Sequence, residues 1–361
     1  MTDHLTAYFQ PGGMFGYLQN LGFFVILIVV SVALTWLCRR YIRIMDVASK
    51  RSSHVGAISR SGGIAIVITF CVGIITYYFV HNDYFVDNRA FSGLFIASLL
   101  IALVSFYDDV TDRALAFKVC SQLIGVAVLI AYGLTINEIT VPYYGKIILG
   151  IWKYPVTVLW IMGITNAFNF MDGLNGLAAG VAVIASLAFM FISFSMGSKF
   201  VFHVSYILSA SCIGFLIFNY PKASIFMGDI GSTFLGFCFG ALAILAANYD
   251  SSHTPFLVIP ILLANIVLEC FMTFIRRFMA GDKVHKAHRT HPYQLLNQLG
   301  MPAALVTLMY YFQSLLLIIV CVIYLMYISE ILAVLVMASL FVIYSMYFAT
   351  IHILARKNGF V

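Results

Sequence analysis

Charged residues are scarce in this chain of 361 residues, where Asp, Glu, Lys and Arg together make up only 9%. A soluble domain carries about 25% charged residues, so an ordinary soluble protein is excluded. Hydrophobic residues make up 62% of the chain, and its mean hydropathy is +1.00. We therefore predict an integral membrane protein whose chemistry lies on or in the bilayer.

Paired cysteines are also missing. The seven cysteines lie in or at the ends of apolar runs, without CxxC spacing, which excludes a zinc or disulfide framework. No Lys or Arg precedes the first apolar run, whereas Arg39 and Arg40 follow it, which is not the pattern of a cleavable signal. Without a soluble block or a long-period repeat, residues 1–361 are expected to form one membrane-embedded domain.

Long apolar runs are abundant. Eleven are long enough to span about 30 Å of hydrocarbon, which predicts an all-α polytopic membrane protein with about 11 transmembrane helices. The runs lie near residues 21–38, 62–80, 91–107, 116–133, 149–163, 173–193, 200–218, 232–249, 256–275, 303–327 and 330–351.

Basic residues fall on one side of this topology. The connections after odd-numbered runs, with the C-terminal tail, hold 16 of the 20 Lys and Arg residues. Because basic loops stay in the cytoplasm, the N-terminus is predicted to be periplasmic and the C-terminus cytoplasmic. The net charge of +6 is thus concentrated on one membrane face. That distribution favours anionic lipids and substrates and offers no surface for nucleic acid.

The most informative stretch is the run from Asn166 through Asn169 and Asp172 to Asn175, four polar side chains at every third residue. On a helix this spacing forms one slowly drifting stripe. Polar groups at membrane depth are costly and mark functional sites or water-filled cavities. The stripe is therefore a candidate site.

Two further acidic motifs lie on the same predicted side. Asp108 and Asp109 are adjacent at the end of an apolar run, where a proton or a cation such as Mg²⁺ would relieve their repulsion. The alternative is a solvated loop start. Asp229 stands between Gly228 and Gly231 directly before another run, where a ligand could approach a helix start. The alternative for Asp229 is simple helix capping.

The remaining cytoplasmic loops are basic. One holds Lys50 and His54 and then Ser59-Arg60-Ser61-Gly62-Gly63, and another holds His288, Arg289 and His291. The two histidines, three residues apart, could be zinc ligands, but no suitable third ligand lies nearby in the sequence. Contact with phosphate oxygens is favoured. Carboxylates for a metal, cations, amides and glycines together are typical of phosphoryl transfer.

At these motifs the chain resembles the polyprenyl-phosphate N-acetylhexosamine-1-phosphate transferases, the family that includes phospho-MurNAc-pentapeptide translocase. The resemblance covers nearly the whole chain and is carried by Asp108-Asp109, by the run from Asn166 to Leu177, and by the segment from Phe226 to Ser232. The segments around His54 and around His288–His291 are similar to the branch that initiates O-antigen synthesis.

The resemblance implies transfer of a sugar 1-phosphate from a UDP-N-acetylhexosamine to undecaprenyl phosphate, releasing UMP, at the cytoplasmic face of a bacterial inner membrane. It implies Mg²⁺, with Mn²⁺ as an alternative, and suggests a homodimer. The sugar and the polysaccharide pathway stay open.

The resemblance also implies roles for single residues. Asp229 would be the principal Mg²⁺ ligand, with Asp172 beside it, and Asp108 or Asp109 would act on the lipid phosphate. The other implied contacts are to the donor: Asn169 near the diphosphate, Phe226 on the uracil, Lys50 and Asn175 near the nucleoside, His288 and His291 on phosphates or sugar, with His54, Asn166 and Arg289 also on the substrate side.

Departures from the family pattern are few. Ser59-Arg60-Ser61 stands where relatives have Pro-Arg-Gly, and Glu269 stands where many have Asp. Two other functions share some of these features. An intramembrane prenyltransferase would share Asp108-Asp109 and Asp112 but needs a second Asp-rich cluster, which the sequence lacks. A secondary transporter would place its acids near mid-bilayer in matching halves, whereas these acids lie at the ends of runs.

Overall fold

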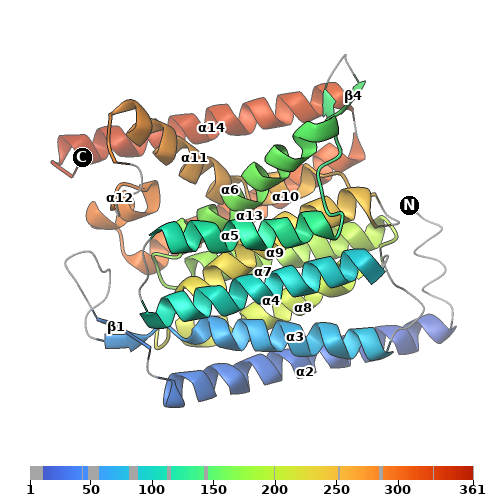
Figure 1. The fold of residues 1–361 in the computed structure, drawn as a ribbon. Coiled ribbons are helices and arrows are strands. Elements are labelled where there is room, and N and C mark those ends of the chain that lie inside the picture. Colours follow the sequence, from blue (N-terminus) through green and yellow to red (C-terminus); the bar gives the residue numbers. More distant parts are fainter. Residues whose placement is uncertain are drawn as a thin grey trace.

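The computed structural model describes residues 11–42, 44–47, 57–80, 88–111, 115–141, 145–198, 200–250, 253–283, 288–327 and 329–360. These residues form a helical bundle with two short antiparallel hairpins (Figure 1). The helices are α2 (Pro11–Tyr41), α3 (Gly62–Val80), α4 (Asn88–Thr111), α5 (Leu115–Ala131), α6 (Lys153–Met171), α7 (Leu177–Ser195), α8 (Phe200–Asn219), α9 (Gly228–Asn248), α10 (Val258–Leu262), α11 (Ala264–Met279), α12 (Pro292–Gln298), α13 (Ala303–Met326) and α14 (Glu330–Lys357). The hairpins are β1 (Met45–Val47) with β2 (Ala57–Ser59) and β3 (Glu138–Val141) with β4 (Gly145–Ile148), and a 3₁₀ turn, η1 (Gly150–Trp152), precedes α6.

The prediction of a mainly helical, multi-pass membrane protein is confirmed. Among the described residues, eight helices are long and apolar enough to cross a bilayer. The eight are α2, α3, α4, α7, α8, α9, α13 and α14. The other predicted runs also correspond to helices, but α5 is shorter, α6 carries polar residues, and the run at 256–275 is broken at Leu263 between α10 and α11. The count of 11 spans and the side on which each terminus lies stay predictions.

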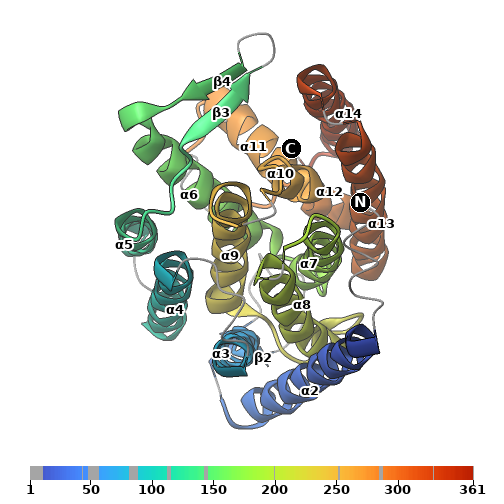
Figure 2. The ribbon, with the colours of Figure 1, turned by 90° about the vertical axis from the view of Figure 1, so that its right-hand side faces the viewer.

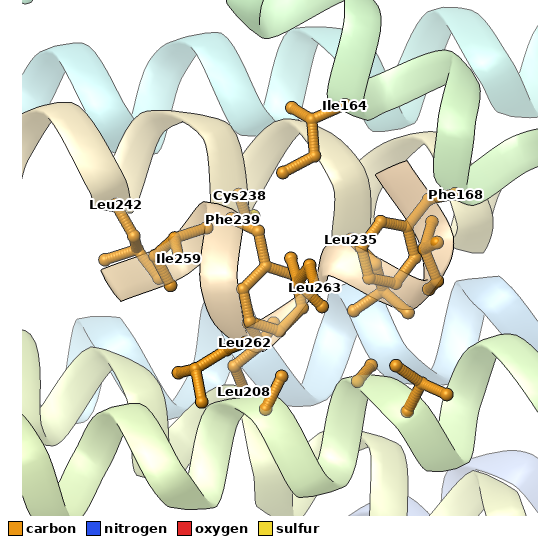
Figure 3. Packing of buried hydrophobic residues seen from close by; sticks show 14 of the residues in the cluster. Ile164, Phe168, Leu208, Leu235, Cys238, Phe239, Leu242, Ile259, Leu262 and Leu263 are labelled. Carbon is orange, nitrogen blue, oxygen red and sulfur yellow. The ribbon is translucent and has the colours of Figure 1, made fainter. Parts of the chain in front are cut away.

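Helix α9 is the central element of the bundle. Figure 2, seen along the helices, places it among α3, α4, α6, α7 and α8. In its most apolar stretch of 18 residues, 94% of the residues are buried. Its side chains pack with α6, α8 and α10 in Figure 3, where the Phe168 and Phe239 rings stack at 5.3 Å. A helix that is apolar all round is typical of the core of a membrane protein.

Glycines let α6 and α9 approach closely. A Cβ at Gly236 would lie 2.7 Å from the Cα of Thr165, and one at Gly240 would lie 2.7 Å from the Ile164 side chain. The indole N–H of Trp160 donates to the Gly240 carbonyl at 3.0 Å. Small residues at membrane helix interfaces allow such close packing. The two helices therefore bring Asn169 and Asp229 together where α6 ends and α9 begins.

The bundle has two chemically different ends. Hairpin β1–β2 and α12 lie at one end, which we call the motif end, and hairpin β3–β4 lies at the opposite end (Figure 1). Helix α2 starts at the opposite end and α14 finishes at the motif end. The alternation of helix direction gathers at the motif end four segments that are far apart in the sequence, residues 59–63, 108–109, 169–172 and 226–233.

Candidate active site

The motif end is organised by main-chain pairing between two loops. The Phe226 N–H donates to the Ser59 carbonyl at 2.7 Å, and the Gly62 N–H donates back to the Phe226 carbonyl at 2.9 Å. The Gly63 N–H donates to the Met227 carbonyl at 2.8 Å. The loop before α3 and the loop before α9 therefore form one unit.

Glycines make that pairing sterically possible. A Cβ on Gly63 would lie 2.3 Å from the backbone nitrogen of Gly231, so the first turns of α3 and α9 are in backbone contact. Gly228 has a φ of +72°, and a Cβ there would lie 2.4 Å from the Arg60 carbonyl oxygen. Only glycine adopts that backbone conformation without strain. This is why glycines flank Asp229.

Asp109 ties α4 to this unit. Its carboxyl Oδ2 accepts the N–H of Ile230, in the first turn of α9, at 2.9 Å. Arg60 donates from Nη2 to the Asp109 carbonyl at 2.8 Å, and its Nε lies 3.8 Å from Oδ1. A carboxylate at a helix start is favoured by the free N–H groups there. Asp109 as a whole is 3% exposed. One of its carboxyl oxygens therefore binds the first turn of α9.

Asp108 and Asp229 share a cation. The Lys118 ammonium on α5 lies 2.9 Å from Asp108 Oδ2 and also contacts Asp229 Oδ2. The sequence prediction counted Lys118 only among the topology-setting basic residues, so its place between two acids was missed. The sequence feature that could have indicated this role is a lone lysine at the start of an apolar run, four residues before Gln122.

Asn169 completes the surroundings of Asp229. Its amide donates to Asp229 Oδ1 and to Ser232 Oγ, each at 3.0 Å. Asp229 accepts from α5 and α6, and the structure shows no side-chain cap at the start of α9. The capping interpretation is therefore not what this carboxylate does here. Nearby, Ser105 and Thr233 hydroxyls share a hydrogen bond of 2.7 Å between α4 and α9.

Asn166 makes a different contact from Asn169. Its amide exchanges two hydrogen bonds with Gln122 on α5, at 2.8 and 3.2 Å, and donates to the Met162 carbonyl at 2.8 Å. Gln122 lies one turn after Lys118 on the same helix. In this arrangement Asn166 holds α5 in place and thereby supports Lys118. Its predicted contact with substrate stays a prediction.

The predicted single stripe from Asn166 to Asn175 is wrong, because the helix ends within it. Helix α6 stops at Met171, Asp172 is its C-terminal capping residue, and α7 begins only at Leu177. Asn175 lies in the intervening turn, with its amide nitrogen 3.4 Å from the Pro221 carbonyl. The stripe is split between a helix and a turn.

Asp172 still belongs with the other acids. Burial first, and then the charges of Asp229 and Asp109, raise the pKa of Asp172 to about 7. Desolvation and like charges both disfavour an ionised carboxyl group. Asp172 directly follows α6, three residues after Asn169, whose amide donates to Asp229.

Phe226 is half-buried, and its backbone is held by Ser59 and Gly62 as described above. Two other predicted substrate contacts, Lys50 and His54, lie outside the described residues. Asp112, which the prenyltransferase alternative would use, also lies outside them.

The histidine loop reaches the end of α6. The His291 ring lies 6.0 Å from the Phe170 ring and 4.9 Å from the His288 ring, between ring centroids. The Tyr293 hydroxyl donates to the Phe170 carbonyl at 2.9 Å. A Cβ on Gly173 would lie 2.1 Å from that hydroxyl oxygen. The loop before α12 thus contacts the segment between Asn169 and Asp172.

Hydrogen bonds and cations surround His288. Its Nδ1 shares a 2.9 Å hydrogen bond with the Thr290 hydroxyl, which also accepts from Arg276 Nη2 at 2.9 Å. Burial first, and then the charges of Arg277 and Arg276, lower the pKa of His288 to about 4. Arg289, half-buried in the same loop, accepts a hydrogen bond at its carbonyl from Gln298 at 2.8 Å. The loop therefore contains a neutral histidine and a positively charged arginine, both of which can bind an anion.

The carboxylates suit a hard divalent cation by charge and by donor type. Four of them lie at the motif end, where Lys118 contacts Asp108 and Asp229 and Arg60 contacts Asp109. Carboxylate oxygens are the ligands that Mg²⁺ prefers. Among the described residues, however, no three acidic, histidine or cysteine side chains form a ready ligand group. The ammonium of Lys118 joins two of the acids instead.

Comparisons with known proteins find relatives that are membrane-lipid-linked sugar-phosphate transferases by name. Residues 91–247 match the model of the family described as glycosyl transferase family 4. The chain is 32% identical over 290 residues to a probable undecaprenyl-phosphate N-acetylglucosaminyl 1-phosphate transferase of Bacillus subtilis, covering 77% of this chain and 79% of the relative. It is 29% identical over 294 residues to a decaprenyl-phosphate N-acetylglucosaminephosphotransferase of Mycolicibacterium smegmatis, covering 73% and 72%. It is 31% identical over 211 residues to a phospho-N-acetylmuramoyl-pentapeptide-transferase of Thermotoga neapolitana, covering 55% and 67%.

Proposed function

The chain belongs to glycosyl transferase family 4, and we propose that it transfers an N-acetylhexosamine 1-phosphate from a UDP-sugar to undecaprenyl phosphate. One observation carries the proposal. Asp108, Asp109 and Asp229, from two helices, lie around Lys118 and Arg60 at one end of a membrane bundle. A site at a bundle end can meet a lipid phosphate and a water-soluble donor together.

The reaction exchanges one phosphoric anhydride bond for another. An oxygen of the lipid phosphate attacks the phosphorus that carries the sugar, the bond to the other phosphate breaks, and UMP leaves. Such transfers depend mainly on positioning and on neutralising charge spread over phosphate oxygens. Lys118 and Arg60 are charged groups already placed at the site, and Asn169 fixes the orientation of the Asp229 carboxylate.

The two members of the Asp108-Asp109 pair differ in what they contact. Asp109 is bound to the α9 backbone and to Arg60, whereas the Asp108 carboxylate contacts the Lys118 ammonium. We assign the lipid phosphate to Asp108, as the residue that positions or deprotonates it, and a supporting role to Asp109. Asp229 and Asp172 would hold Mg²⁺, which when bound supplies positive charge to the phosphate oxygens.

The donor would be bound by the remaining groups. Phe226 would stack on the uracil, Asn175 would lie near the nucleoside, and His288 with Arg289 and His291 would contact phosphates or sugar. We further propose that the site faces the cytoplasm of a bacterial inner membrane and starts O-antigen or another cell-surface polysaccharide. A single membrane-embedded domain and a homodimer remain part of this proposal.

The experiment that tests the reaction uses purified protein in detergent with undecaprenyl phosphate and a panel of UDP-sugars. Release of UMP with formation of a lipid-linked sugar diphosphate, lost on chelation of divalent cations and restored by Mg²⁺, is the expected result. Release of pyrophosphate would instead indicate a prenyltransferase. Movement of a solute across proteoliposomes without a covalent product would indicate a transporter.

Donor binding can be tested separately from turnover. His288→Ala should weaken binding of the UDP-sugar in calorimetry by about tenfold, because it removes a group from the phosphate side of the site. Unchanged affinity would remove His288 from the binding site and leave the transfer reaction itself untouched.

A further inference from the structure

A buried carboxylate on α11 has no part in the chemistry proposed above. Glu269 is 2% exposed, and it accepts hydrogen bonds from the Tyr310 hydroxyl on α13 and, at 3.4 Å, from the Tyr293 N–H on α12. The Tyr347 hydroxyl on α14 donates to Tyr310 at 3.4 Å. Four helices thus meet at one carboxylate. Burying a carboxylate is costly even when it is bonded, so packing alone is a poor reason for its presence.

A histidine of the candidate donor site lies beside Glu269. His291 is 4% exposed, and its Nδ1 lies 4.0 Å from Glu269 Oε1. Within the described chain this nitrogen is buried and has no hydrogen-bond partner. Buried polar atoms are paired in most native structures. The buried Glu269 carboxyl group and the unbonded Nδ1 of His291 therefore lie beside each other.

The ring of His291 is held in place by its neighbours. It stacks on His288 at an interplanar angle of 22°, and it lies 5.8 Å from the Tyr293 ring and 6.0 Å from the Phe170 ring. Its backbone N–H donates to the Gln294 side chain at 3.3 Å. These neighbours fix the plane of the ring. The chemistry of His291 then depends on which ring nitrogen carries the proton.

Burial, and then the charges around it, keep His291 neutral at pH 7. Burial first, and then His288, Arg277, His352 and Arg276, lower the pKa of His291 to about 3. These groups come from the histidine loop, α11 and α14, and Glu269 is the acid that faces the ring from α11. A neutral imidazole has one N–H, and the hydrogen bond made by one nitrogen decides the state of the other.

We propose that Glu269 is a positioning residue for His291, accepting its Nδ1–H and so leaving Nε2 as the nitrogen that meets the UDP-sugar. The pair has to close by about 1 Å to reach hydrogen-bond distance. The part of this proposal that concerns the UDP-sugar rests on the proposed function, whereas the part that concerns the tautomer does not. Orienting partners of this kind typically change activity by 10- to 100-fold.

A double-mutant cycle tests whether Glu269 acts through His291. In the UMP-release assay, Glu269→Gln should lower kcat/KM for the UDP-sugar by about 10- to 100-fold. In a His291→Asn background the same change should cost less than about twofold, because the ring it orients is gone. Equal losses in both backgrounds would overturn the proposal and make Glu269 a residue of the fold only.

Tyr347→Phe is the matched control. It removes a hydroxyl from the same hydrogen-bonded chain, one step beyond Tyr310, and leaves Glu269 intact. Its kcat/KM should stay within about twofold of the parent, and its effect should multiply with that of His291→Asn. A loss as large as that of Glu269→Gln would show that the assay reports general damage to this region.

A spectroscopic measurement reads the tautomer directly, without turnover. Protein labelled with ¹⁵N-histidine, compared with His291→Asn to assign the signal, should show His291 protonated at Nδ1. Glu269→Gln should reduce that population, whereas Tyr347→Phe should leave it unchanged. A parent signal protonated at Nε2 would overturn the proposal. If the parent released no UMP with any UDP-sugar, the proposed function would fail, and this spectrum would still decide the role of Glu269.

Discussion

The two ends of the bundle use buried polar residues in different ways. At the opposite end, the Tyr249 hydroxyl donates to the Gly133 carbonyl and accepts from the Thr135 N–H, at 3.4 Å, and from the Asn137 amide, at 3.3 Å. Thr157 accepts the Ile136 N–H at 2.9 Å. These neutral groups satisfy one another and close the connection from α5 to α6. Nothing in that set is left with an unbalanced charge.

At the motif end the same kind of bonding surrounds charged groups. Asp108 and Asp229 share one lysine, and Asp109 shares Arg60 with a helix start. Repulsion and desolvation of this kind cost stability and are retained where a ligand uses them. The comparison teaches that buried hydrogen bonds alone do not identify a site, whereas acids brought together from separate helices do.

The largest expected effect is at Asp229. Asp229→Asn should reduce the rate of transfer by about 1,000-fold or more, because a neutral amide is a poor ligand for a cation and loses the pairing with Lys118. The apparent Tm should change little, since Asn169 can still bond to the new side chain. Near-normal turnover in the purified variant would refute the assignment of Asp229 to the metal.

Lys118 should come next. Lys118→Met, which keeps an unbranched side chain and removes its charge, should lower the rate of transfer by about 100-fold. Lys118→Arg should recover part of the loss, because a cation returns to the two carboxylates. The rates of both variants are measured against the parent at one salt concentration, and equal rates for Met and Arg would show that charge at this position is irrelevant.

Substitutions of the two adjacent acids, Asp108 and Asp109, should affect different properties: one the rate, the other the stability. Asp108→Asn should reduce the rate and alter its pH profile while leaving Tm nearly unchanged. Asp109→Ala should destabilise the protein by about 1–3 kcal/mol, because the Ile230 N–H is left buried without an acceptor. Identical behaviour of the two variants in both measurements would contradict the division of roles between them.

The opposite end should respond in stability alone. Tyr249→Phe removes the hydroxyl that joins Gly133, Thr135 and Asn137, and should cost about 1–2 kcal/mol. Transfer activity should stay within about twofold of the parent at a temperature where the variant is folded. A large loss of activity would mean that the two ends are not independent.

The last prediction concerns acid stability, where the effect develops only as the pH is lowered. Because the pKa of His291 is lowered to about 3 from an ordinary value of 6.5, the unfolded chain binds the proton more readily than the folded one. Stability is therefore full above pH 6.5 and falls as the pH drops toward 3, by about 2 kcal/mol between pH 7 and 5. His291→Asn should show a smaller drop in apparent Tm over that range than the parent does.

Much of this arrangement follows from the sequence. Hydrophobic runs predicted the helices because membrane segments must be apolar and satisfy their own backbone. The alternation of spans then placed Asp108, Asp172 and Asp229 on one side, and the structure brings them to one end of the bundle. The roles of these residues in catalysis stay predictions.

Other features depended on contacts that no local pattern carries. Lys118 looks like any loop lysine until α5 packs beside α4 and α9, and Asn166 looks like part of a polar stripe until Gln122 faces it. The end of α6 at Met171 was missed because periodic spacing says nothing about where a helix stops. Glu269 gained a neighbour, His291, only when α12 packed against α11.

The backbone contact between Gly63 and Gly231 has a consequence for exchanging parts between relatives. Because the backbones of residues 59–63 and 226–228 hydrogen-bond to each other, they form a matched pair although helices α3 to α8 separate them along the sequence. A chimera that imports one loop from a homologous enzyme should misfold locally unless it imports the other as well. Evolution is therefore expected to change these two loops together.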